Sequence, residues 1–244
     1  MCQGDPMTPL RPTLLAAFLL TSAALTACSG GDEEGSAEKV DTPEQVLLQA
    51  KELLDGTSGV EATLSTDEDP GTDYLSEARG TITADPAAFE GTIAGRVLGF
   101  PATDISVVSV DGSVWIDVPF SGWTDEYSPQ DFCGPDPATL LDPDTGVSGV
   151  LTSATDLSAG DSERAEDDPS VVITPYTGTV PGDAIREVLP CTESDDVEAT
   201  FTIDDEGYLR TADITGAFFP DSDPITYRIA IDAYDVTKDI QAPK

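Results

Sequence analysis

Residues 105–118, with the sequence ISVVSVDGSVWIDV, decide the fold class because they contain a complete β-hairpin. Asp111 and Gly112 at its centre form a dipeptide that two-residue type I′ turns prefer, and β-branched residues recur on both sides. The turn predicts three cross-strand pairs: Val110 with Ser113, Val108 with Trp115, and Val107 with Ile116. One face is then wholly apolar, and we expect it to point inward: Ile105, Val107, Val114, Ile116 and Val118. The opposite face, which includes Val108, Val110 and Trp115, is mixed.

The same alternation of apolar and polar residues returns in segments 197–204, 208–218 and 227–232. In the first, Phe201 lies among apolar residues at alternate positions, and a turn at 205–207 leads into the second. In the third, Ile229 and Ile231 share a face. Patterns of period two joined by tight turns predict an antiparallel sheet with one solvated face.

Segment 91–100 alternates small with medium-sized residues: Ile93, Gly95, Val97 and Gly99 share its candidate inward face. Glycine weakens a strand and marks a bend or a close approach. Two interpretations stay open here, a simple bend and a sheet curved around a hollow.

Three helices are expected beside the sheet. The first begins at Thr42, which with Gln45 forms a capping box around Pro43, and ends at Gly56. Its apolar face comprises Val46, Leu47, Ala50, Leu53 and Leu54. The other two, at 144–155 and 181–189, are short and amphipathic; Val147, Val150 and Leu151 lie at helical spacing in the former.

Near the start of the chain, Leu25-Thr26-Ala27-Cys28 closes the apolar stretch 13–27. A cysteine after two small residues and a leucine is typical of a bacterial lipobox, where cleavage precedes the cysteine and the thiol receives a diacylglyceryl group. A transmembrane helix needs about 20 apolar residues, and a soluble secretory signal has no reason to place a cysteine there. The pattern favours a lipoprotein anchored through Cys28 to the outer face of the plasma membrane.

The domain boundaries follow from this interpretation. Residues 1–27 are expected to be the signal peptide, with Met1 and Met7 both open as the start. Residues 28–41, rich in glycine, serine and glutamate, are expected to form a flexible acidic tether. Residues 42–244 are expected to form one domain with a sizeable core.

Charge and composition exclude several functions. The chain has 47 acidic and 11 basic residues, a net charge of −36, and no histidine. Nucleic-acid binding needs clusters of lysine and arginine, and the common nucleophilic triads and zinc sites need histidine. Segment 142–146 alternates acids but does not continue to the glutamate of a calcium loop, and a helix started by Pro143 explains it better. We expect no enzyme, no cofactor and no metal.

Once Cys28 is used for lipid attachment and Cys2 lies in the signal peptide, Cys133 and Cys191 remain. In an oxidising compartment these two are expected to form a disulfide, worth roughly 4 kcal/mol on chain-entropy grounds. The bridge would tie together the flanks of the two short helices.

These features together resemble one known family. A lipobox, a polar tether, an opening helix, Trp123-Thr124, and Leu141-Asp142-Pro143-Asp144-Thr145-Gly146 leading into residues 147–151 are similar to the LppX/LprAFG lipoprotein family of actinobacteria, and most to its LprG branch. The resemblance covers roughly residues 43–240. It implies an α+β fold, in which helices pack on the concave face of a strongly curved antiparallel half-barrel and enclose a hydrophobic cavity.

The resemblance also implies a function. It indicates a carrier that binds acylated envelope lipids, of triacylglycerol or glycolipid type, and transfers them within the envelope, with a membrane transporter as a candidate partner. The apolar side chains expected to line the cavity come from two helices and the sheet: Val46, Ala50, Leu53, Leu54, Ile93, Val97, Ile105, Val107, Val114, Ile116, Val147, Val150, Leu151, Phe201, Ile229 and Ile231. The alternative is a non-catalytic structural or interaction lipoprotein with a filled core.

Overall fold

The computed structural model describes residues 41–97 and 99–244. The predicted signal peptide, Cys28 and all of the predicted tether except Asp41 lie outside the described residues. The elements of the described part are, in chain order, α1 (Pro43–Asp55), β1 (Gly59–Ser65), β2 (Tyr74–Ala84), β3 (Ala87–Val97), β4 (Phe100–Val110), β5 (Ser113–Val118), β6 (Gly122–Thr124), η1 (Pro129–Phe132), η2 (Pro137–Thr139), α2 (Ser148–Ser153), β7 (Thr155–Ala159), β8 (Glu163–Arg164), β9 (Val172–Pro181), α3 (Gly182–Arg186), β10 (Asp196–Asp204), β11 (Leu209–Gly216) and β12 (Ile225–Tyr234).

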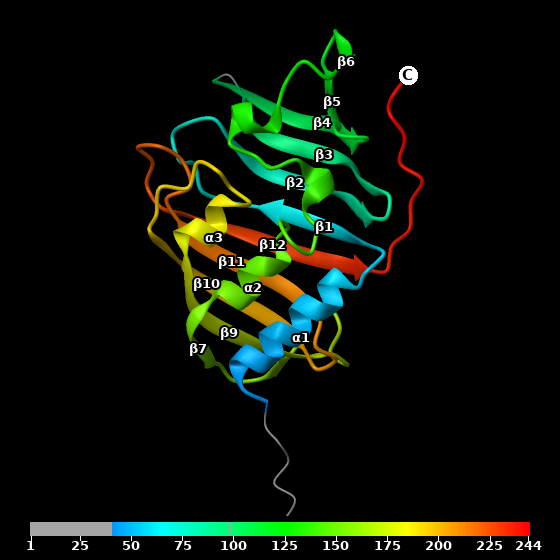
Figure 1. Cartoon of the computed structure of the whole chain (residues 1–244). Coiled ribbons are helices and arrows are strands. Elements are labelled where there is room, and N and C mark those ends of the chain that lie inside the picture. The colour runs from blue at the N-terminus through cyan, green and yellow to red at the C-terminus, as the bar shows by residue number, and fades with distance from the viewer. Residues whose placement is uncertain (1–40, 98) are drawn as a thin grey trace, which may run out of the picture. The chain divides into compact units, whose positions relative to one another are not determined.

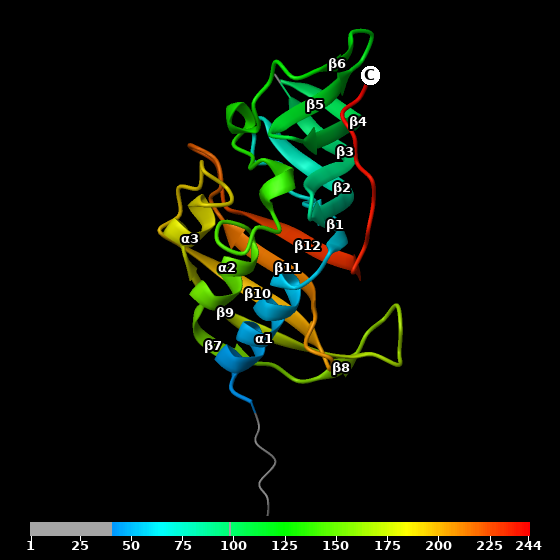
Figure 2. The ribbon, with the colours of Figure 1, turned by 45° about the vertical axis from the view of Figure 1, so that its right-hand side comes forward.

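The strands form one antiparallel sheet in the order β6-β5-β4-β3-β2-β1-β12-β11-β10-β9-β7, with the short β8 paired to β9. The sheet is curved and does not close into a barrel (Figures 1 and 2). The first and last strands, β1 and β12, pair in its middle and so join two halves. The prediction of a curved antiparallel sheet is confirmed.

The hairpin at 105–118 has the predicted register. Val107 pairs with Ile116, Val108 with Trp115 and Val110 with Ser113, and both Asp111 and Gly112 have positive φ in the turn. The predicted pairing of segments 197–204 and 208–218 is also present, as β10 and β11, although β11 is shorter and ends at Gly216. Local alternation and turn chemistry were sufficient to specify these strands.

The mixed face of that hairpin is less solvated than expected. Val108 and Val110 are buried with Ala88 and Ile240 in a second hydrophobic cluster, and Trp115 packs against it. Ile240 belongs to the carboxyl-terminal segment 235–244, which follows β12 and runs along this side of the sheet (Figure 2). A segment distant in sequence therefore covers the face that was expected to be wet.

Segment 91–100 is not one strand, which corrects the prediction. Strand β3 ends at Val97 and β4 begins at Phe100, and these two residues pair across a hairpin. The register of β3 shifts near Gly95 against both neighbours, β2 and β4. Gly95 has φ +156°, and a Cβ atom there would lie 2.1 Å from the carbonyl oxygen of Tyr74. The glycine therefore marks a close approach at an irregularity in the sheet.

The first predicted helix is confirmed. The hydroxyl of Thr42 accepts the backbone N–H of Gln45, the Gln45 side chain accepts the backbone N–H of Thr42, and Pro43 opens the helix. The other two helices are shorter than predicted. Helix α2 starts at Ser148 because residues 142–147 form turns, and α3 spans only Gly182–Arg186.

The sheet, the disulfide and both hydrophobic clusters are built from residues within 41–244. Residues 40–244 form a compact unit of their own. This unit has its own sheet, core and disulfide.

Candidate functional site

The layer between the helices and the sheet is the place where the predicted lining residues meet. Helices α1, α2 and α3 lie over one face of the β9–β12 half of the sheet (Figure 1). Helix α1 contacts α2 and β7, while α2 contacts α3 and β9. On the other half, η2 contacts β2, β3 and β4.

Helix α1 presents its predicted apolar face to this layer. Leu47, Ala50 and Leu54 are almost fully buried, and Val46 packs against them. Leu48 points the other way and is 48% exposed. The spacing of the leucines thus gives α1 one buried face and one solvated face.

The start of α2 is shaped by the segment 141–146. The Asp142 carboxylate accepts the backbone N–H groups of Thr145 and Asp144, both at 2.9 Å, and the Thr145 hydroxyl at 3.1 Å. These bonds to the charged form hold the pKa of Asp142 below its ordinary value, with the Thr145 N–H as the largest cause. The chain then reverses, since the N–H of Val147 donates to the carbonyl of Leu140 at 3.0 Å. The reversal places Val150 and Leu151 in the core.

One lysine joins α1 to this segment. The ammonium group of Lys51 lies 2.6 Å from a carboxylate oxygen of Asp55, and it also donates to the hydroxyl of Ser148 at 3.1 Å and to the carbonyl of Pro143 at 3.3 Å. The side chains of Lys51 and Asp55 are about one-fifth exposed. Sequence reasoning missed this contact, because a charge on a helix gives no sign of its partner across the fold.

Cys133 and Cys191 form a disulfide, as predicted, with their Cα atoms 5.4 Å apart and a sequence separation of 58. Cys133 follows η1, and Cys191 lies shortly after α3. The bridge therefore connects the segment that leads to α2 with the segment that leaves α3.

Most of the predicted lining residues meet in one hydrophobic cluster between the helices and the sheet. These are Val46, Ala50, Leu54, Ile93, Val107, Val114, Ile116, Val147, Val150, Leu151, Phe201, Ile229 and Ile231. Leu53 and Ile105 are half-buried and belong to neither cluster, and Val97 lies at the end of β3. Contact of any of these residues with lipid stays a prediction.

The cluster contains further residues that were not predicted to line a site. Several are almost completely buried: Leu47, Val60, Val180, Val197, Ile203 and Phe218. The alternation around Phe201 already indicated Val197 and Ile203. Val180 gave no such signal, because its position depends on the pairing of β9 with β10.

Two tyrosines extend polar groups into this core. The hydroxyl of Tyr227 donates to the carbonyl of Leu75, and that of Tyr234 donates to the carbonyl of Leu209, both at 2.9 Å. Burial raises the pKa of both phenols above the ordinary value of 10.0. Both therefore stay neutral in the folded protein, and their hydroxyl groups are satisfied by the backbone.

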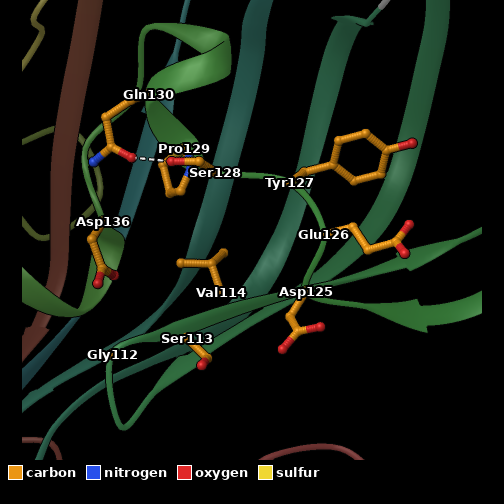
Figure 3. A pocket seen from close by; sticks show the side chains of 10 residues that line it. All are labelled: Gly112, Ser113, Val114, Asp125, Glu126, Tyr127, Ser128, Pro129, Gln130 and Asp136. Atoms are coloured by element: carbon orange, nitrogen blue, oxygen red, sulfur yellow. Dashed lines mark hydrogen bonds between the residues drawn. The ribbon is translucent and has the colours of Figure 1, made fainter.

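Two of the pockets on the surface of the described part have no lining residue from α1 or α2. One, of about 310 Å³, lies beside the β3–β4 hairpin and is lined by Tyr74, Ser76, Gly95, Arg96, Gly99 and Pro101. The other, of about 330 Å³, lies between the β4–β5 turn and the loop after β6 (Figure 3). Its lining includes three carboxylates, of Asp125, Glu126 and Asp136, and no basic side chain. The side chains of the helix–sheet layer are mostly buried, and they line neither of these two pockets except for Val114 and Tyr74.

The described residues contain neither a membrane-spanning helix nor a cluster of metal ligands. In residues 41–97 and 99–244, no helix has both the length and the hydropathy needed to cross a membrane. The same residues contain no group of three or more acidic or cysteine side chains placed to hold a metal ion.

Comparison with known proteins identifies the family. The profile of the LppX_LprAFG lipoprotein family matches residues 42–242, which is nearly all of the described chain. The chain belongs to this family. The lipoarabinomannan carrier protein LprG of Mycolicibacterium hassiacum is 31% identical over 183 residues, which cover 72% of this chain and 74% of that protein.

Two solved structures of LppX_LprAFG lipoproteins share the fold. LprF from Mycobacterium bovis has a TM-score of 0.65 at 14% identity, covering 82% of this chain and 96% of that one. The lipoprotein LppX of Mycobacterium tuberculosis has a TM-score of 0.59 at 17% identity, covering 82% and 98% respectively. The resemblance to the LppX/LprAFG family and its LprG branch is thereby confirmed.

Proposed function

We propose that this protein is a lipid-anchored carrier of the cell envelope that binds the acyl chains of an envelope lipid between its helices and its sheet. Cys28 would hold it to the outer face of the plasma membrane, residues 29–41 would act as the tether, and the domain from residue 42 would hold the cargo. The cargo is an acylated lipid of glycolipid or triacylglycerol type, which agrees with the lipoarabinomannan carrier named among the relatives. No bond is made or broken in this function.

One observation carries the proposal. Apolar residues from α1, α2 and both halves of the sheet converge on a single cluster beneath the helices. The helical layer over it is thin, because α2 spans only Ser148–Ser153 and α3 only Gly182–Arg186. Such a layer can separate from a sheet with less loss of structure than a strand can.

The energetics favour acyl chains as the cargo. A lipid with two or three chains exposes several hundred Å² of apolar surface, and burial is worth about 25 cal/mol per Å². The gain is on the order of 10 kcal/mol, and the acyl chains would also cover the apolar faces that α1 and α2 lose when they separate from the sheet. The structure, in which the apolar faces of α1 and α2 are buried, then corresponds to the closed form of the carrier.

Lipids bound to the purified domain test the proposal. Residues 41–244 should release fatty acyl species into organic solvent, detected by mass spectrometry, and should take up added acylated lipid after delipidation. The substitution Val150→Trp fills the layer from α2 and should abolish uptake. Val108→Trp is the matched control, because Val108 is equally buried but in the second cluster, and it should leave uptake unchanged.

The burial of most side chains in this layer favours a second function. A structural or interaction lipoprotein would keep this core filled permanently. That alternative is supported if the well-folded, delipidated domain takes up no acylated lipid. If the parent and both tryptophan variants take up lipid equally, the cargo does not bind beneath α2.

A further inference from the structure

Two aromatic side chains at hairpin tips have no packing role in the domain. Phe120 is fully exposed, and Phe100 is 74% exposed. Each side chain lies on a hairpin turn, whereas the apolar residues of a groove that binds another protein usually lie on a flat or concave surface. One exposed apolar side chain is ordinary, so the argument for a partner depends on what the two tips have in common.

Both tips lie at the same end of the strands. Strands β3, β4, β5 and β6 run antiparallel in succession, so the β3–β4 and β5–β6 turns face one way and the Asp111–Gly112 turn faces the other. Both tips are also apolar in sequence: residues 97–101 read VLGFP, and Pro119 precedes Phe120. Both tips therefore project from the same end of this half of the sheet.

The backbone conformation at Phe120 is unfavourable for a phenylalanine. The N–H of Ser121 donates to the carbonyl of Val118 at 3.0 Å, which defines a four-residue turn with Pro119 and Phe120 in the middle. Phe120 has φ +69°, in a turn position that favours glycine. A phenylalanine that is both strained and unburied is a poor choice for stability alone.

The charge of the chain limits which kind of surface can be the partner. The chain has a net charge of −36, and Arg96 beneath the β3–β4 tip is paired with Asp69 at 2.8 Å. The net negative charge and the pairing of Arg96 therefore disfavour an anionic partner surface. A neutral lipid surface accepts aromatic side chains into the boundary between headgroups and acyl chains without needing positive charge.

We propose that Phe100 and Phe120 insert together into a neutral lipid surface and dock the domain on it. This interaction surface is separate from the cargo layer, and it goes beyond the carrier function by naming the face that meets a membrane. Docking places the 310 Å³ pocket beside Arg96 and Gly99 next to the headgroups. Because the contact is apolar, its strength changes little with salt concentration.

Flotation of residues 41–244 with phosphatidylcholine vesicles tests the docking. Phe100→Ser and Phe120→Ser are each expected to weaken binding about tenfold, and the double variant more. Leu48→Ser is the matched control, since Leu48 is exposed on α1, and it should bind like the parent domain. Thermal unfolding of all variants should match, because neither phenylalanine is buried.

A depth measurement adds a positive readout. Trp115 and Trp123 fluoresce in every variant, so quenching by brominated phosphatidylcholine is compared with that of the parent. Phe100→Trp and Phe120→Trp should increase the quenched fraction, and Leu48→Trp should decrease it because its added tryptophan stays in water. The proposal is overturned if the domain does not float with these vesicles, if the serine variants bind as well as the parent, or if binding requires anionic lipid. Equal loss in Leu48→Ser also overturns it. Flotation and quenching do not measure uptake of lipid into the domain. A negative result would therefore contradict the docking proposal but not the proposed carrier function.

Discussion

Gly146 is the residue on which the start of α2 depends. A Cβ atom at this position would lie 2.4 Å from the carbonyl oxygen of Leu140 and 2.5 Å from that of Asp142. Both are backbone atoms, so the turn itself would have to move. We expect Gly146→Ala to lower the free energy of unfolding by about 1–3 kcal/mol, measured by urea denaturation.

Gly149 supplies the matched control for that substitution. It lies three residues further along, inside α2, and a Cβ atom there meets nothing within 4 Å. Because alanine favours helix over glycine, Gly149→Ala should leave stability unchanged or raise it by up to about 1 kcal/mol. Equal destabilisation by both substitutions would show that the turn geometry is not the reason for Gly146.

At the scale of elements, Lys51 holds α1 against the segment that leads to α2. Replacing it by Lys51→Met keeps the aliphatic stem but removes the bonds to Asp55, Ser148 and Pro143. The second carboxylate oxygen of Asp55 is already buried without a hydrogen-bond partner. Loss of the Lys51 ammonium group would therefore leave the Asp55 carboxylate without its positive partner. We expect a loss of about 1–2 kcal/mol in the free energy of unfolding, together with faster exchange of bound lipid.

An exposed lysine is the control that tests whether the effect of Lys51→Met comes from the burial of its ion pair. Lys238 pairs with Glu90 at 3.3 Å, and both side chains are more than 40% exposed. Lys238→Met should change stability by less than about 0.5 kcal/mol and should not alter lipid exchange. If the two methionine variants exchange lipid at the same rate, Lys51 does not restrain the helical layer.

The elements differ in how far sequence alone specifies them. Helix α1 was predicted to its first turn because Thr42 and Gln45 act on residues three positions apart. The start of α2 was placed too early, because the pattern of apolar residues does not show that Val147 donates to Leu140. For the site, spacing identified which side chains face the core. Whether that core opens for a lipid depends on the energy difference between two packings of the same residues, which no local pattern contains.

At the scale of the whole molecule, two long-range connections hold the fold together. The pairing of β1 with β12 joins the halves of the sheet, and segment 235–244 covers the outer side through Ile240. Neither can be predicted from local sequence, because each depends on residues more than 100 positions apart. The Cys133–Cys191 bridge, by contrast, followed from the count of cysteines and the expected compartment.

The bridge gives the last prediction, because it connects both flanks of the helical layer. The double substitution Cys133→Ser with Cys191→Ser opens a loop of 58 residues, and the chain-entropy estimate gives a loss of about 4 kcal/mol in the free energy of unfolding. If the bridge also restrains separation of the helices from the sheet, the variant should exchange a fluorescent acylated lipid faster than the oxidised parent. Reduction of the parent domain should reproduce both effects. Lower stability with an unchanged exchange rate would mean that the bridge stabilises the fold but does not restrain entry of the cargo. The cargo would then enter at a part of the helix–sheet layer that the bridge does not hold together.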